Sequence, residues 1–107
     1  MTASNLLIVY VTCPPDDSER IAEIIVSEKL AACVNILPGK SLYYWEGKLF
    51  HDKETLLIMK TSRGRYNDLE GKIKEIHPYD IPEIVAIKAE SVQADYLKWV
   101  HEQTGER

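Results

Sequence analysis

The stretch SLYYWEGKLF, residues 41–50, decides the predicted fold because it is typical of the turn region of a long β-hairpin. Aromatic and apolar residues, which favour strands, flank Glu46-Gly47-Lys48, a sequence typical of a turn. Residues 32–37 (ACVNIL) begin the outgoing strand, with an expected interruption at Pro38-Gly39, and residues 54–61 (ETLLIMKT) form the return strand. Both strands are long for a chain of 107 residues, so we expect the hairpin to project beyond its own core.

A strand and a helix are predicted on each side of this hairpin. Residues 6–12 (LLIVYVT) form a continuous apolar run rich in β-branched residues, which is typical of a strand buried on both faces. Two prolines end that strand, and apolar residues at 3.6-residue spacing then predict a helix with Asp16 as its N-cap. A second helix is predicted over residues 65–76 and ends before Pro78. It is followed by a strand over residues 83–90.

The predicted order is strand, helix, strand, strand, helix, strand, with a short terminal helix over residues 94–103. This is the order of the α+β ferredoxin-like fold, βαββαβ, in which two helices cover one face of an antiparallel four-stranded sheet. The length is typical of one domain, and we assign residues 1–107 to it. The fold by itself does not indicate a function, because proteins with this fold have many different functions.

Composition and charge narrow the class of protein. The net charge is −4 and the sequence pI is about 5.3, so no excess of basic residues is available to neutralise phosphates. This argues against nucleic acid as a partner, and also against a basic helix on a membrane surface. No leader pattern is visible, and the apolar run at residues 6–11 is too short to cross a bilayer. Because two cysteines make no disulfide framework, we interpret the chain as a cytoplasmic protein with reduced thiols.

Five motifs occur in an order and at a spacing that point to a known family. They are EKLAACVNI (28–36), SLYYWEGK (41–48), MKT (59–61), HPYDIPEI (77–84) and YLKW (96–99). Together they resemble the CutA divalent-cation tolerance proteins over nearly the whole chain. The resemblance implies a ferredoxin-like fold, a tight homotrimer in which the long hairpins pair with neighbouring subunits, and a likeness to PII-type signalling trimers. It also implies a role in tolerance to divalent cations, copper above all, with no established enzymatic reaction.

The residues of the hairpin favour assembly independently of the resemblance. Leu42, Tyr43, Tyr44 and Trp45 lie together on a strand that is expected to form an edge. An unpaired edge of this length is a liability in a monomer, and Tyr and Trp are favoured at protein interfaces. We therefore expect the chain to partner with itself, as a homotrimer held through the hairpin edges.

A copper site, if it exists, is expected to be weak. Copper prefers thiolate and imidazole ligands, and the Met-x-Cys-x-x-Cys motif of copper chaperones with this fold is absent from the sequence. Some bacterial CutA proteins carry a copper site made of a cysteine late in the first strand and two adjacent histidines before a Pro-Tyr pair. The corresponding positions here are Val11, Ile76 and His77. The resemblance thus leaves His77 as a tentative metal ligand and Cys13 as a weaker one, with copper or another divalent cation as the candidate and no cofactor required.

His77 has two further interpretations. It stands just past a helix end, where an imidazole can bond to free carbonyl groups in a purely structural role. Alternatively, His77, Tyr79, Trp45 and Lys60 line a cleft between subunits, where a cation, an aromatic platform and hydrogen-bonding groups suit a small anionic ligand. The chain would then be a PII-like trimeric sensor of an anionic metabolite, and this alternative stays open.

The cysteines and the prolines bear on reactivity. Cys33 stands between small and apolar residues, so we expect it to be buried in the core. Cys13 precedes a helix N-terminus, which lowers thiol pKa values, and is better placed to ionise, although two prolines intervene.

The two prolines after Cys13 also remove the backbone amides that an acylphosphatase-type phosphate cradle needs. With no nucleophile elbow, phosphate loop or metalloprotease helix in the sequence, the chain is not expected to be an enzyme.

Overall fold

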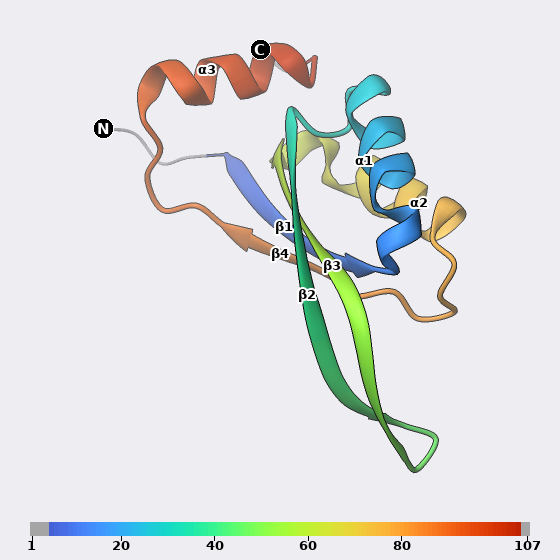
Figure 1. Ribbon diagram of the computed structural model, residues 1–107. Helices are drawn as coiled ribbons and strands as arrows, with labels where there is room; N and C mark the ends of the chain where they lie inside the picture. Colours follow the sequence, from blue (N-terminus) through green and yellow to red (C-terminus); the bar gives the residue numbers. More distant parts are fainter. Residues whose placement is uncertain (1–4, 106–107) are drawn as a thin grey trace.

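The computed structural model describes residues 5–105, and its elements follow the predicted order (Figure 1). The ends of the predicted domain, residues 1–4 and 106–107, lie outside the described residues. The strands form one antiparallel sheet in the order β2-β3-β1-β4, which confirms the ferredoxin-like fold. The elements are β1 (Leu6–Cys13), α1 (Ser18–Ser27), β2 (Cys33–Trp45), β3 (Lys48–Ser62), α2 (Tyr66–Ile76), β4 (Ile84–Lys88) and α3 (Ala94–Gln103).

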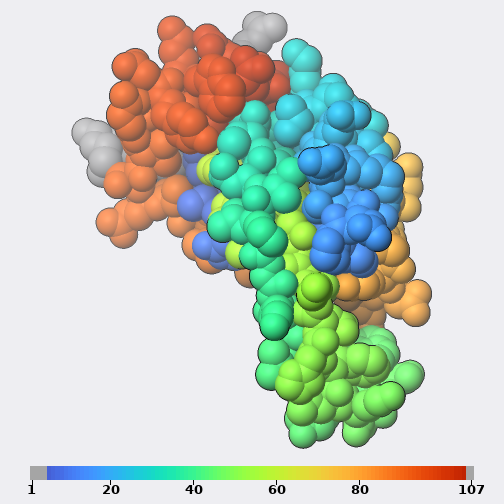
Figure 2. Space-filling model, in the orientation of Figure 1, coloured from blue at the N-terminus to red at the C-terminus, as the bar shows by residue number. Residues whose placement is uncertain are grey.

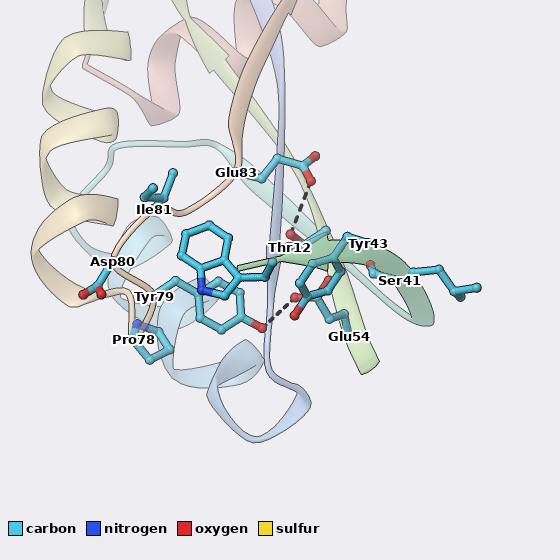
Figure 3. A pocket seen from close by; sticks show the side chains of 11 residues that line it. Thr12, Ser41, Tyr43, Glu54, Pro78, Tyr79, Asp80, Ile81 and Glu83 are labelled. Atoms are coloured by element: carbon cyan, nitrogen blue, oxygen red, sulfur yellow. Dashed lines mark hydrogen bonds between the residues drawn. The ribbon is translucent and has the colours of Figure 1, made fainter. Parts of the chain in front are cut away.

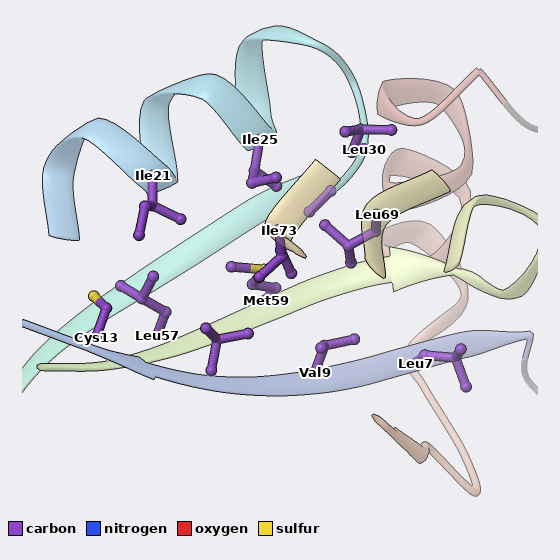
Figure 4. Close-up of a cluster of buried hydrophobic side chains, with 12 residues drawn as sticks. Leu7, Val9, Cys13, Ile21, Ile25, Leu30, Leu57, Met59, Leu69 and Ile73 are labelled. Carbon is purple, nitrogen blue, oxygen red and sulfur yellow. The ribbon is translucent and has the colours of Figure 1, made fainter. Parts of the chain in front are cut away.

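The core lies between the sheet and the helices α1 and α2, which cover one of its faces (Figure 4). Alternate residues of β1 face this core, because successive side chains of a strand point to opposite sides of the sheet. Each large side chain that is fully buried here contributes roughly 1.5–3 kcal/mol to the stability of the fold. The fully buried members from the strands and the two helices include Val9, Val11, Leu57, Met59, Ile21, Ile25, Leu69 and Ile73.

The hairpin of β2 and β3 projects from this body, as predicted (Figure 1, Figure 2). The two strands pair from Cys33 opposite Lys60 to Trp45 opposite Lys48, so the loop between them has two residues. Both loop residues have positive φ, 50° at Glu46 and 78° at Gly47, which is the backbone of a tight hairpin turn. The projecting arm makes the chain elongated, with extents of 46 × 25 × 21 Å.

Strand β2 is not interrupted at Pro38, so the expected break at Pro38-Gly39 is wrong. Pro38 lies opposite Thr55 in a continuous ladder. Because β2 is an edge strand of the sheet, a residue without an N–H is tolerated where that N–H would point away from the neighbouring strand.

The start of α1 also differs from the prediction. A short 3-10 turn, Pro15–Asp17, precedes the helix, and the N-cap is Asp17 instead of Asp16. The Asp17 side chain does not cap the helix; it accepts a hydrogen bond from the guanidinium of Arg20, 2.9 Å away. The two prolines move the helix start by one residue, because they set the backbone of the preceding turn.

The opposite face of the sheet is covered only in part. Helix α3 covers one end of it, where Val100 packs with Leu6 and Ala32. The remainder carries apolar side chains that are partly or largely exposed in the single chain. We call this surface the open sheet face; its members, which pair across adjacent strands, are Tyr10, Leu37, Leu56, Ile58, Val85 and Ile87.

Candidate functional site

A pocket of about 570 Å³ lies where the hairpin meets the loop between α2 and β4 (Figure 3). Its walls come from three segments that are far apart in the sequence. They are the end of β1, the hairpin on both of its strands, and the loop of residues 78–83. Two of the residues predicted to form a ligand cleft, Trp45 and Tyr79, line this pocket.

His77 directly precedes the loop that lines the pocket and is bonded to that loop and to β1. Its side chain is buried, and Nδ1 accepts a hydrogen bond from the backbone N–H of Tyr79 at 3.1 Å. Since Nδ1 accepts, the ring proton is on Nε2, which donates to the carbonyl oxygen of Thr12 at 2.8 Å. The imidazole therefore ties the end of α2 to the end of β1. This contact is structural, but the carbonyl group that it reaches belongs to β1 and not to the helix end, as one interpretation had expected.

Tyr79 and Glu54 connect the loop to the hairpin. The Tyr79 hydroxyl donates to Oε2 of Glu54 at 2.6 Å, and Figure 3 shows this contact across the pocket. Burial, followed by the hydrogen bond to Glu54, raises the pKa of Tyr79 well above its usual value. The phenol therefore keeps its proton and acts as a hydrogen-bond donor.

Tyr43 forms a second phenol–carboxylate contact on the hairpin. Its hydroxyl donates to Oδ2 of Asp52, and its ring stacks on Phe50 with centroids 5.6 Å apart. The hydrogen bond to Asp52 is the main cause that raises the pKa of Tyr43 to about 12. Both phenols at this site thus present a neutral ring next to a carboxylate.

The charge of the pocket is negative. Glu54, Asp80 and Glu83 line it, and none of its lining residues is a lysine, arginine or histidine. Glu83 accepts a hydrogen bond from the Thr12 hydroxyl at 3.4 Å, whereas Asp80 points away from Glu54 in Figure 3. An anionic ligand is unfavourable here in a single chain, because no cation is present to balance its charge.

Lys60 does not join the pocket of its own chain. It lies on β3 six residues beyond Glu54, about 20 Å away along the strand. Its ammonium group donates to Oδ1 of Asn35 and lies 3.9 Å from the sulfur of Cys33. The predicted cleft of Trp45, Lys60, His77 and Tyr79 between subunits therefore stays a prediction.

The environments of the two cysteines are the reverse of those expected. Cys13 is fully buried in the core, and this burial, with Asp17 and Glu54 nearby, raises its pKa to about 11. The expectation that the helix N-terminus favours its thiolate is wrong, because loss of hydration outweighs the helix dipole. Cys33 is only partly buried, on the side of the sheet opposite α1 and α2, so its predicted place in the core is also wrong.

The residues expected to bind copper do not fit a metal in this conformation. Both ring nitrogens of His77 are engaged in hydrogen bonds, and the Cys13 thiol is protonated at neutral pH. Within residues 5–105, no group of three or more His, Cys, Asp or Glu side chains is arranged to hold a metal ion.

Sequence reasoning missed Glu54 and Glu83. Each stands at the first position of a predicted strand, residues 54–61 and 83–90. Two strands that are joined through a crossover helix run parallel, so the first residues of both strands lie at the same end of the sheet. That topological relation is the signal that could have placed both carboxylates at one site.

Known proteins resemble this chain over most of its length. A model of the CutA1 divalent ion tolerance protein family matches residues 7–103. A divalent-cation tolerance protein CutA from Pyrococcus horikoshii is 41% identical over 100 residues, covering 92% of this chain and 98% of that protein. The chloroplastic Protein CutA 1 from Oryza sativa is 45% identical over 102 residues, covering 94% of this chain and 58% of that protein.

A solved structure also resembles this chain in its fold. The apo form of the PII-like protein CutA from Nostoc has a TM-score of 0.89 and 36% identity, covering 92% of this chain and 96% of that one. Within the described residues, no helix is both long enough and apolar enough to cross a membrane. The family match spans the elements that build both the sheet and the pocket, and the chain belongs to the CutA1 divalent ion tolerance protein family.

Proposed function

We propose that this chain acts as a homotrimer in the tolerance of, or response to, divalent metal ions, copper among them, and that it catalyses no reaction. The family to which the chain belongs is named for divalent ion tolerance. The observation that carries the assembly is the open sheet face together with the exposed hairpin. A cytoplasmic location is part of the proposal and is supported by two free cysteines, although the relative from Oryza sativa is named chloroplastic.

The open sheet face is too apolar for a surface that stays in water. Val85 and Ile87 of β4 are each 47% exposed in the single chain, and Leu37 of β2 is 42% exposed. On the projecting hairpin, Leu42 is 62% exposed and Tyr44 is 73% exposed, and strand alternation places both on the face opposite to Leu37. Exposed apolar surface of this kind marks an interaction site, and other copies of the same chain offer apolar surface to cover it.

The two sheet edges favour a closed ring. Strand β2 is a long free edge and β4 is a short one, so an edge-to-edge contact between copies joins two different surfaces. Such heterologous contacts run on into filaments unless the rotation between copies closes them into a ring. In a ring of three chains, both edge strands of every chain can pair with a neighbouring chain. This agrees with the homotrimer that the resemblance implies.

Light scattering coupled to size exclusion tests this assembly. We expect a single species of three chain masses that persists at sub-micromolar concentration, because the buried faces are apolar. A folded species of one chain mass would contradict the proposal.

Copper contact at His77 and Cys13 is weak in this proposal. A metal would have to displace one of the two hydrogen bonds of His77, and it would have to remove the proton of a buried thiol. Each step opposes binding. The tolerance function therefore does not depend on a high-affinity site at these residues.

Calorimetric titration with copper measures this contact. We expect a dissociation constant weaker than about 1 µM for the wild type and further weakening in His77→Ala. His51→Ala, at an exposed histidine on the hairpin, is the matched control and should bind as the wild type does. Tight binding that survives His77→Ala would show that the copper contact lies elsewhere.

PII-like signalling is the second candidate function, since the Nostoc relative is named a PII-like protein. In that case a small anionic metabolite would bind in clefts between subunits. Because the pocket lining of one chain is acidic, Lys60 of a neighbouring copy would have to supply the positive charge. Titration with a panel of nucleotides in the same calorimeter separates this function from the first.

A further inference from the structure

The pocket has the charge and the ring content of a site for an organic cation. We propose that it binds a small alkylammonium ion, with the charge held by carboxylates of the hairpin and the loop and the alkyl groups packed on aromatic rings. This inference goes beyond the proposed function and does not depend on contact with copper.

Glu54 is the first reason for assigning a cation. Glu54 is only 6% exposed, and its Oε2 accepts a hydrogen bond from the Tyr79 hydroxyl. No lysine, arginine or histidine among residues 5–105 forms an ion pair with it. A buried carboxylate without a counter-charge is costly, so a cation that enters the pocket gains a favourable partner.

The second carboxylate and the phenols distinguish an organic cation from a metal ion. Glu83 also lines the pocket, where one of its oxygens accepts the Thr12 hydroxyl (Figure 3). Two carboxylates, each already engaged by a hydroxyl, leave too few oxygen ligands for a hard divalent metal. The phenol of Tyr79 keeps its proton because its pKa is raised, so it does not act as an anionic ligand.

Three aromatic side chains complete the site. Tyr43, Trp45 and Tyr79 line the same cavity. A cation that lies within about 6 Å of such rings is attracted by the negative charge of their faces, most of all at tryptophan. The volume of about 570 Å³ lies in the usual range of small-molecule sites and is ample for a cation of this size.

Choline and its neutral isostere 3,3-dimethyl-1-butanol provide the test, because they share a shape and differ in charge. In a Trp99→Phe background the remaining tryptophan, Trp45, reports on the pocket. We expect choline chloride to change the Trp45 fluorescence saturably in the millimolar range, with sodium chloride as the ionic-strength control. The neutral alcohol and inorganic phosphate should give no saturable change.

Variants assign this response to the carboxylates. Glu54→Gln should weaken choline binding about tenfold or more, since it removes a buried charge and keeps the side-chain size. Glu23→Gln changes the net charge equally on the exposed side of α1, and we expect it to bind as the wild type does. If Glu54→Gln fails to fold, Glu83→Gln at an exposed position should still weaken binding severalfold.

Three results would overturn the assignment: an equal response to the alcohol and to choline, saturable binding of phosphate, or no response to choline at all. Light scattering on the same samples keeps this test separate from the proposed function. A trimer that does not bind choline contradicts only the cation site. A monomer contradicts the assembly.

Discussion

Replacing Ile87 by aspartate is expected to convert the proposed trimer into folded monomers. Ile87 is 47% exposed in the single chain and lies opposite Ile8 on the side of the sheet away from α1 and α2, so the main core does not depend on it. If other copies of the chain cover the open sheet face, every interface between two copies would bury the new aspartate carboxylate without a partner. That costs several kcal/mol at every interface, which is more than an interface of modest size withstands.

Light scattering and circular dichroism together measure this effect. We expect one chain mass for Ile87→Asp with the secondary structure of the wild type. Val26→Asp is the matched control, because Val26 is also an exposed apolar residue, at 41%, but lies on α1. It should remain a trimer, and an Ile87→Asp variant that also remains a trimer would remove the open sheet face from the interface.

The thiol of Cys13 should react at least about a hundredfold more slowly with iodoacetamide in the folded protein than in the unfolded one at pH 8. The reason is that the thiolate is the nucleophile, and the folded state raises the thiol pKa from 9.0 to about 11. Below pH 9 this difference lowers the thiolate fraction by two orders of magnitude, and burial slows the reaction further.

The sign of the pH dependence follows from the same shift. Because the folded state holds this proton more tightly, the stability contributed by the neutral thiol is present below pH 9 and is lost as the pH rises through about 11. Labelling followed by mass spectrometry should show the modification of Cys13 rising over that interval, with protein unfolded in urea as the reference. Equal rates in folded and unfolded protein at about pH 8 would contradict the buried, protonated state.

Part of the pocket lining was predicted, whereas its role as a binding site stays a prediction. The sequence indicated that Trp45 and Tyr79 belong to a binding site, because aromatic residues at a hairpin tip and a proline-bounded loop after a helix are visible as local patterns. The sign of its charge was not visible. Glu54 and Glu83 enter the pocket from the starts of two strands separated by a helix, whereas Lys60, which was expected to supply a cation, lies at the far end of β3.

The two cysteines show why such details escape a reading of the sequence. Cys13 pairs with Thr55 and faces the helices, while Cys33 pairs with Lys60 and faces the other side of the sheet. Side chains alternate between the two faces of a strand, so a shift of one residue in register exchanges buried for exposed. The surroundings of a cysteine thus depend on pairing partners that are distant in the sequence.

The amino-acid sequence by itself determined the order of the elements, the long hairpin with its turn at Glu46-Gly47, and the family resemblance, because apolar spacing and turn residues act over a few neighbouring positions. Only the tertiary structure decided that His77 is bonded through both nitrogens, that Cys13 is buried and that the pocket is acidic. Those properties arise where segments far apart in the chain meet, and strand register and crossover geometry set which side chains come into contact there.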